Sequence, residues 1–237
     1  MRKIAILLLL LSFCASSFAA GVAVDGFAGM WQYDMHVNNE DINGSTMTFG
    51  AEANLSFPVG GPLALGVDAS FGILQGKEEG SPYLASGSDL LVGATVQYSV
   101  PITSGTAYAA AGGGMKKFKL DVGENGQINT REYTLAGALL GGGFSYELSP
   151  TMMFVGDGRI LLPLSNLQTM DDQGFHDKGE AKGFLVSLSA GAQMKLSESL
   201  LGEIRGRVSM ENFSGSIGDE KISATSFGAK AGVKILF

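Results

Sequence analysis

Apolar and polar residues alternate along most of the chain. From Met47 to Phe57 every odd position is apolar, and every even position is polar or glycine. Successive side chains of a β-strand point to opposite faces, so this segment predicts a strand with one apolar and one polar face. Six segments alternate clearly and four do so less regularly, two of these because of Gly-Gly-Gly runs. The ten predicted strands are Val22–Val37, Met47–Phe57, Leu63–Ile73, Leu90–Val100, Ala107–Leu120, Glu132–Leu148, Met152–Leu162, Phe184–Met194, Leu200–Met210 and Phe227–Phe237.

The connections between these strands are short and long in turn. Short connections at one end and long, polar ones at the other are typical of β-barrels of bacterial outer membranes, with turns in the periplasm and loops outside. An even strand number then places both termini on the periplasmic side. Aromatic residues near both ends of the strands fit the two girdles of such barrels. The predicted turns are Pro58–Pro62, Pro101–Thr106, Ser149–Thr151 and Ser197–Ser199, and the predicted loops are Asn38–Thr46, Lys77–Ser88, Asp121–Arg131, Pro163–Lys182 and Ser214–Ile222.

The N-terminus has the layout of a secretory signal peptide. Two basic residues precede the apolar run Ile4–Leu11, and small residues follow at Ser17 and Ala19. This pattern predicts a signal over residues 1–20, cleaved near Ala19 or Ala20, and a barrel over residues 21–237. A lipoprotein anchor at Cys14 is the alternative, which the bulky residue before it disfavours. Loss of Cys14 with the signal leaves no disulfide or thiol chemistry.

The composition points to a membrane strand protein. Only 16% of the residues are charged and the mean hydropathy is +0.20. Beyond the signal, no stretch approaches the roughly 20 continuous apolar residues of a membrane helix. An exported sandwich or lipocalin-like barrel would also alternate, but with its apolar face inward. The formal net charge of −7 argues against a nucleic-acid partner.

Strands can cross a bilayer only as a closed ring, because each unpaired amide in hydrocarbon costs several kcal/mol. The fold class is therefore an all-β, closed, antiparallel, up-and-down transmembrane β-barrel of ten strands, with eight or twelve as alternatives. Its polar faces then line the lumen, and their mixed charges predict either a salt-bridged plug or a narrow charged passage. The predicted lumen residues are Glu52, Asp68, Asp157, Arg159, Glu203, Arg205, Arg207, Lys230 and Lys234, with Lys195 on the same face.

The C-terminus carries a family resemblance. Lys230, Gly232, Ile235 and Phe237 occupy the polar, glycine, hydrophobic and terminal aromatic positions of a short motif. This motif resembles the assembly signal of bacterial outer-membrane β-barrel proteins. The resemblance implies delivery by periplasmic chaperones and insertion by the barrel-assembly machinery, and it identifies no narrower family.

Candidates for catalysis are few. The two histidines, His36 and His176, fall at or in predicted outer loops, and His176 lies in the acidic run Asp171–Asp177. Carboxylates beside an imidazole could provide general base chemistry. Barrel proteases of the omptin family use an Asp pair and an Asp–His pair, but no second acidic pair with matching context is found here. Barrel lipid A deacylases use His and Ser, whereas Lys178 stands two residues after His176. The spacing matches no calcium or zinc site, so we predict no catalytic residue, metal or cofactor.

These observations favour a non-enzymatic outer-membrane barrel. It would either stabilise the membrane or pass small solutes through a narrow charged lumen. One alternative is surface adhesion or recognition by the long outer loops, and another is a hydrolase that uses His176 and nearby Asp residues. The expected partners are outer-membrane lipids and lipopolysaccharide, with no nucleic acid.

Overall fold

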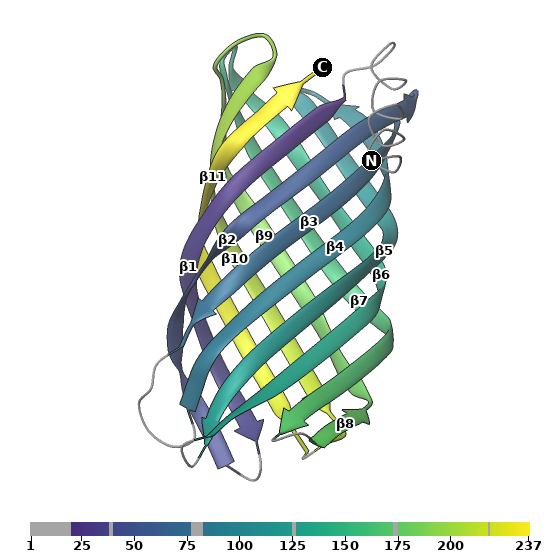
Figure 1. Cartoon of the computed structure of the whole chain (residues 1–237). Helices are drawn as coiled ribbons and strands as arrows, with labels where there is room; N and C mark the ends of the chain where they lie inside the picture. The colour runs from purple at the N-terminus through teal and green to yellow at the C-terminus, as the bar shows by residue number, and fades with distance from the viewer. Residues whose placement is uncertain (1–19, 38–39, 77–82, 125–126, 173–174, 218) are drawn as a thin grey trace, which may run out of the picture.

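The computed structural model describes residues 20–37, 40–76, 83–124, 127–172, 175–217 and 219–237. The predicted signal peptide lies almost entirely outside these residues and stays a prediction. None of the described residues forms a helix long and apolar enough to cross a membrane. The strands are β1 (Gly21–Val37), β2 (Glu40–Gly60), β3 (Leu63–Gln75), β4 (Tyr83–Ile102), β5 (Gly105–Glu124), β6 (Gln127–Ser149), β7 (Met152–Asp172), β8 (Phe175–Gly179), β9 (Ala181–Lys195), β10 (Leu200–Gly215) and β11 (Lys221–Leu236) (Figure 1).

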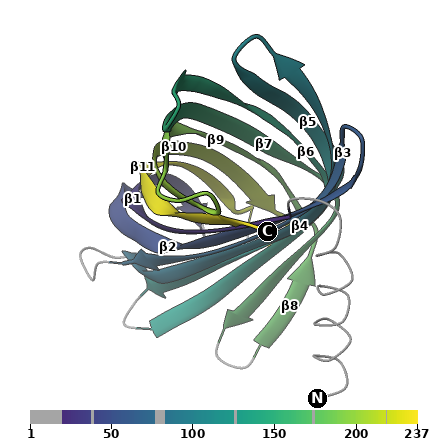
Figure 2. The ribbon, with the colours of Figure 1, turned by 90° about the horizontal axis from the view of Figure 1, so that it is seen from above.

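Ten of these strands form a closed antiparallel barrel. Each pairs with its neighbour along the chain, β7 pairs with β9, and β1 pairs with β11 to close the ring. The short β8 pairs only with the far end of β7. The ribbon accordingly encircles an interior when it is viewed from above (Figure 2). The predicted all-β barrel of ten strands is confirmed.

The start of β1, the end of β11 and the four short turns lie at one end of the barrel, which we call the turn end (Figure 1). The turn between β2 and β3 depends on glycine, because Gly60 and Gly61 have φ values of 144° and 57°. The opposite end, the loop end, carries the remaining connections.

At the loop end the strands are longer than the sequence predicts. Four predicted loops, Asn38–Thr46, Lys77–Ser88, Asp121–Arg131 and Pro163–Lys182, are wrong in extent because much of each is paired strand. The last of them contains the end of β7 and all of β8. Alternation continues through these segments, but with reversed polarity, so they look like polar loops rather than strands of a lipid-facing barrel.

The reversal is clear along β1. Val24 and Met30 face outward and are 50% and 40% exposed, whereas Asp25 between them is buried inside. Beyond Met30 the outward residues are polar, as at Gln32, and the inward residue Trp31 is buried. The outward apolar series ends at a similar level on nine strands of the barrel, whereas on β7 exposed Leu164 and Leu167 follow Leu162 beyond that level. The last outward apolar residues on the nine strands are Met30, Met47, Ile73, Leu90, Met115, Ala136, Phe184, Met210 and Phe227.

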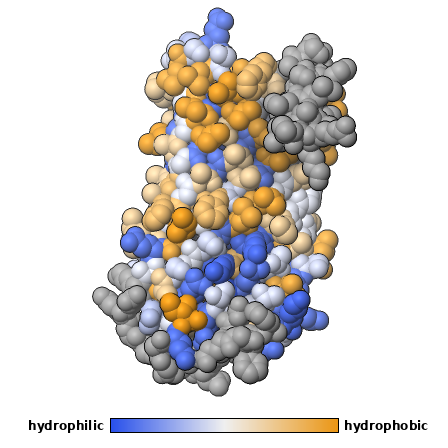
Figure 3. All heavy atoms as spheres, in the orientation of Figure 1, coloured by the Kyte–Doolittle hydropathy of each residue, from blue (hydrophilic) through white to orange (hydrophobic). Residues whose placement is uncertain are grey.

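This level divides the barrel into a turn half and a loop half. On β3 the outward apolar run from Leu63 to Ile73 matches the roughly 9–11 residues with which a tilted strand crosses a bilayer. Hydrophobic residues cover the part of the surface nearer the turn end, and hydrophilic residues gather toward the loop end (Figure 3). The loop half therefore projects from the membrane and, like a water-soluble protein, keeps its apolar core inside.

Candidate functional site in the barrel interior

Charged side chains of both signs line the turn half. Glu52 on β2 accepts a hydrogen bond from Lys230 on β11 at 3.0 Å, and Arg207 on β10 forms an ion pair with it at 2.8 Å. Arg159 on β7 lies 4.0 Å from Glu52 and 3.8 Å from Asp68 on β3. Residues far apart in the sequence thus meet around one carboxylate, and this pairing makes a charge tolerable away from bulk water.

A second group lies beside the first. Arg205 on β10 bonds to Asp157 on β7 and to Glu203 at 2.7 Å. Lys230 extends the first group to Asp25 on β1, which lies 3.6 Å from its Nζ. The charged lining is therefore a network of two neighbouring groups across the barrel interior.

These groups surround a cavity of about 440 Å³, which we call the charged chamber. Its wall reaches Ser56, Ser99 and Leu236 beside the short turns, so the chamber opens toward the turn end. Its charged lining consists of Asp25, Glu52, Asp68, Asp157, Arg159, Glu203, Arg205, Lys230 and Lys234.

The structure places all nine predicted lumen residues on the inner wall of the turn half. Eight line the charged chamber, and Arg207 lines a smaller cavity on the loop-end side of the chamber. Lys195, which the sequence also places inward, is exposed at the turn end. Asp25 was missed because glycines blur the alternation of its strand, although outward Val24 on the same strand points to its inward position.

A buried lysine lies between the chamber and the loop half. Lys116 on β5 donates hydrogen bonds to Asp89 at 2.9 Å and to Glu211 at 2.6 Å, and its side chain is 2% exposed. Asp89 lies on β4, the neighbour of β5, whereas Glu211 lies on β10 across the barrel, so Lys116 bridges the interior. None of the three was predicted as a lumen residue, because each lies at the level where the polarity reverses.

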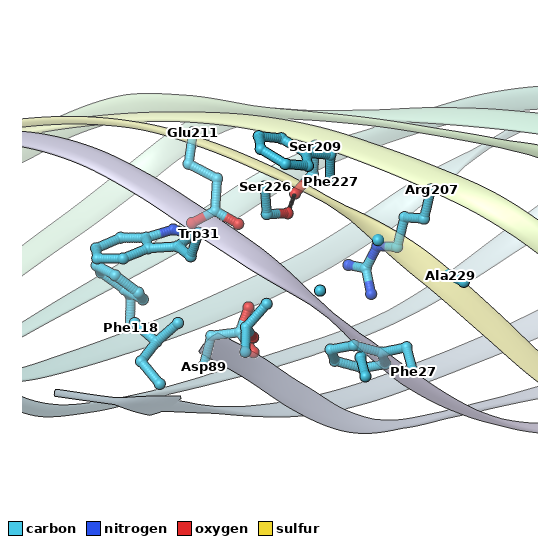
Figure 4. A pocket seen from close by; sticks show the side chains of 15 residues that line it. Phe27, Trp31, Asp89, Phe118, Arg207, Ser209, Glu211, Ser226, Phe227 and Ala229 are labelled. Atoms are coloured by element: carbon cyan, nitrogen blue, oxygen red, sulfur yellow. Dashed lines mark hydrogen bonds between the residues drawn. The ribbon is translucent and has the colours of Figure 1, made fainter. Parts of the chain in front are cut away.

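The smaller cavity lies on the turn-end side of this bridge. Its volume of about 30 Å³ is enough for one or two water molecules. Arg207 lies 4.6 Å from the ring centroid of Phe27, and Ser209 and Ser226 hydrogen-bond to each other at 2.6 Å. Figure 4 shows Asp89 and Glu211 reaching into this region from opposite walls. The cavity separates the charged chamber from the apolar interior.

Four aromatic side chains, which we call the aromatic seal, cross the loop half: Trp31, Phe118, Tyr133 and Phe213. The Phe118 and Phe213 rings stack at 5.0 Å, with Trp31 5.8 Å from the former and Tyr133 5.9 Å from the latter. All four are at most 3% exposed. They come from β1, β5, β6 and β10, so they extend across the width of the lumen rather than lining one wall.

A second layer of side chains spans the loop-end opening of the barrel, beyond the aromatic seal. Glu220, immediately before β11, accepts hydrogen bonds from Arg131, Tyr133 and Gln168, the last at 2.7 Å. Gln168 also bonds to the backbone of Ile217, so the β10–β11 connection is fixed to β6 and β7 across the mouth. Burial, and then the Glu220 carboxylate, raise the pKa of Tyr133 well above its usual value. We call these residues the Glu220 cluster.

The outer membrane protein beta-barrel domain family matches residues 5–176, which is most of the chain. The chain belongs to this family. Among solved structures, the outer membrane protease OmpT from Escherichia coli is similar with a TM-score of 0.61 and 9% identity, over 93% of this chain and 98% of OmpT. A major outer membrane protein from Thermus thermophilus has a TM-score of 0.42 and 13% identity, over 92% and 99%. Ail, the attachment invasion locus protein of Yersinia pestis, has a TM-score of 0.33 and 14% identity, over 91% and 99%.

At 9% identity the similarity to OmpT establishes the fold alone, and no curated protein matches the chain. Family and fold together make this an outer-membrane, transmembrane, porin-like β-barrel. Neither the family nor these structures specifies its activity.

The residues of the C-terminal motif also have places in the folded barrel. Ile235 and Phe237 are exposed on the lipid-facing side, by 40% and 63%. Lys230 belongs to the charged network, and a side chain at Gly232 would collide with Asp25. The motif therefore serves the fold itself in addition to the assembly role that the resemblance implies.

In this outer-membrane barrel, His36 is not among the residues that line the chamber. His36 hydrogen-bonds to Asp41 at 2.7 Å near the loop end, where Asp41 is largely exposed. His176 pairs with Asp171 in the register of β7 and β8. No group of three or more potential metal ligands occurs among the described residues.

Proposed function

We propose that this protein is a non-enzymatic structural barrel of the outer membrane with a closed lumen. The turn half would be embedded in lipid with its turns and termini in the periplasm, and the loop half would project outward next to lipopolysaccharide. The alternation of short turns and long loop-end connections supports this orientation. The observation that carries the proposal is the aromatic seal across the lumen.

The seal is too stable to open by thermal fluctuation. A buried aromatic side chain removes about 150–250 Å² from water, which corresponds to about 4–6 kcal/mol at about 25 cal/mol per Å². A continuous water path would have to rehydrate several of these rings at once. The Glu220 cluster and the Lys116 bridge would have to open as well.

Planar-bilayer conductance of the refolded protein tests this proposal. The wild-type protein is expected to give no discrete channels, and a Phe118→Ala/Phe213→Ala variant is expected to leak more than the wild type. Phe71→Ala, on the lipid-facing surface, is the matched control and should be silent. Discrete wild-type channels whose ion preference changes in Arg205→Ala/Arg207→Ala would overturn the closed lumen and establish a charged, porin-like passage.

Surface recognition is the second candidate. Leu164, Ile128 and Leu167 lie at or beyond the membrane level and are 84%, 60% and 44% exposed. Exposed apolar side chains on a projecting, polar surface are typical of binding sites. Replacing all three with Ser should abolish cell adhesion without affecting folding if the barrel is an adhesin. Unchanged adhesion would exclude these residues as the binding surface.

A hydrolase using His176 and nearby carboxylates is the third possibility. The backbone register places His176 opposite Asp171, so such a site would lie at the loop end and not in the charged chamber. The test of this possibility is to measure cleavage of peptides and of lipid A by the wild type and by the His36→Ala and His176→Ala variants. Activity that either change removes would refute the non-enzymatic proposal.

Assembly by periplasmic chaperones and the barrel-assembly machinery is proposed from the C-terminal motif. Deleting Phe237 removes an exposed ring and only one backbone hydrogen bond, from its amide to Ala20. We therefore expect the truncated protein to refold in vitro but to accumulate poorly in the outer membrane. Normal accumulation would mean that the motif serves only the fold.

A further inference from the structure

The charged chamber contains unused hydrogen-bond donors. Its lining holds five carboxylates, and four of them accept a hydrogen bond from a side chain. The fifth, Asp25, lies 3.6 Å from Lys230, and one of its oxygens has no hydrogen-bond partner. Two cations on the same wall donate no hydrogen bond to a carboxylate: Arg159 forms ion pairs only at 3.8 and 4.0 Å, and Lys234 forms no ion pair within the described ranges. The free hydrogen-bonding capacity of the chamber is therefore mainly cationic.

Arg159 suits the recognition of an anion. Its side chain is 20% exposed, and its guanidinium lies at the chamber wall with its planar set of N–H donors uncommitted. Such a group binds carboxylate or phosphate oxygens through two parallel hydrogen bonds. Lys234 pairs in register with Ala23 and Leu201 close to the turn end, so its charge lies near the chamber entrance.

The rest of the chamber favours an organic ligand. Its volume of about 440 Å³ is within the range of small-molecule sites, roughly 300–1,000 Å³. Buried Leu139, Val155 and Leu201 contribute to the wall and offer contact to a hydrocarbon portion. The aromatic seal blocks the opposite side, so a ligand enters and leaves only at the turn end.

We infer that the charged chamber binds a small organic anion from the turn end, with the carboxylate or phosphate group of the anion on Arg159 and Lys234 at the entrance. This inference goes beyond a structural role and adds a ligand site that faces the compartment of the short turns.

Isothermal titration of the refolded full barrel tests the inference. The probes are glutarate and benzoate as carboxylates, glycerol 3-phosphate as an organic phosphate, inorganic phosphate, and glycerol as the neutral control. Organic anions should bind, and glycerol should not. Arg159→Gln should weaken binding at least about tenfold, the equivalent of one hydrogen bond to a charged group. Lys234→Gln should weaken it less, and added salt should weaken it further.

Lys195→Gln is the matched control, since Lys195 is exposed at the same end without lining the chamber. Arg159→Lys keeps the charge and tests the planar donor geometry, and each variant must show the mobility shift of a folded barrel. Binding of inorganic phosphate as tight as that of the organic anions would overturn the organic ligand. Absence of binding, or equal affinity in Arg159→Gln, would overturn the site and leave the chamber as a hydrated salt-bridge plug. The result is independent of conductance, so the two proposals can fail separately.

Discussion

The ion pair between Arg131 and Glu220 should control the stability of the loop half. Both side chains are completely buried. Replacing Glu220 with Leu leaves the Arg131 charge without its partner, and replacing Arg131 with Met does the same to Glu220. The double change removes both charges together, so comparing the three variants separates the worth of the pair from the penalty of breaking it.

The expected magnitudes follow from this burial. Removing one partner of a buried ion pair typically costs about 3–5 kcal/mol, whereas replacing the whole pair with apolar residues is often nearly neutral. In the double variant, Tyr133 and Gln168 lose their acceptor on Glu220, which costs about 1–3 kcal/mol. Each single variant should therefore be less stable than the double variant.

Trp31, the only tryptophan of the chain, provides a local assay. Its ring is 3% exposed and stacks 4.8 Å from Tyr33 within the loop half. Its fluorescence during urea unfolding in lipid vesicles reports exposure of the aromatic seal. The matched control is the pair Lys117 and Glu132, which is 2.9 Å apart but partly exposed. Breaking that pair should change the unfolding free energy by less than about 1 kcal/mol.

Two results would refute this reasoning. If Glu220→Leu destabilised the loop half no more than the surface control, the pair would not hold the β10–β11 connection in place. If the effects of the single changes simply added in the double variant, the two charges would not be energetically coupled. Either result would remove the Glu220 cluster as the second layer of closure.

Three further perturbations test other parts of the barrel. Burial and Glu220 raise the pKa of Tyr133 above its value in the unfolded chain. The contribution of Tyr133 to the unfolding free energy is therefore fully present below about pH 10 and is lost as the pH rises further. Tyr133→Phe should reduce this loss, as measured by unfolding curves at alkaline pH. Burial alone would raise the pKa of Asp121, but hydrogen bonds from Ser86 and Thr130 lower it overall. The contribution of Asp121 to the unfolding free energy is therefore present above about pH 4 and is lost in acid. Asp121→Asn should make the unfolding free energy less dependent on pH in the acid range. Lys116→Met leaves the buried Glu211 carboxylate and the partly buried Asp89 carboxylate without their shared cation and should cost about 3–5 kcal/mol in urea unfolding; no measurable loss would count against the bridge.

The sequence was sufficient for the turn half of the barrel. There the outward face meets lipid, so residues such as Leu65 and Val67 must be apolar at every second position, with polar groups like Asp68 inside. The period and the polarity both carry information, which is why the strands and the inward charges could be predicted. The specific ion pairs could not, since they depend on which strands face each other across the closed ring.

The loop half was missed for a physical reason. Segments such as the start of β2 have Asp41 and Asn43 outward and Ile42 inward, the pattern of a strand facing water. If apolar residues are assumed to face lipid, this pattern looks like a polar loop. The aromatic residues near the loop end were accordingly predicted to form an interfacial girdle, whereas Phe118 among them is buried in the lumen. A search for the position at which each strand changes polarity would have found both the extra strand length and the seal.

The same change of polarity decides the state of the lumen. A strand that projects beyond the membrane has water outside, so its polar residues turn outward and its apolar residues turn inward. In a ring of ten strands the inward apolar side chains are close enough to meet, as the stacked Phe118 and Phe213 do. The projection of the loop half and the proposed closure of the lumen therefore follow from one sequence pattern. Because the outer surface of the loop half is polar, its apolar residues must pack inside, which is incompatible with an open lumen at that level. The charged network of the turn half, in contrast, leaves room for water and ligands.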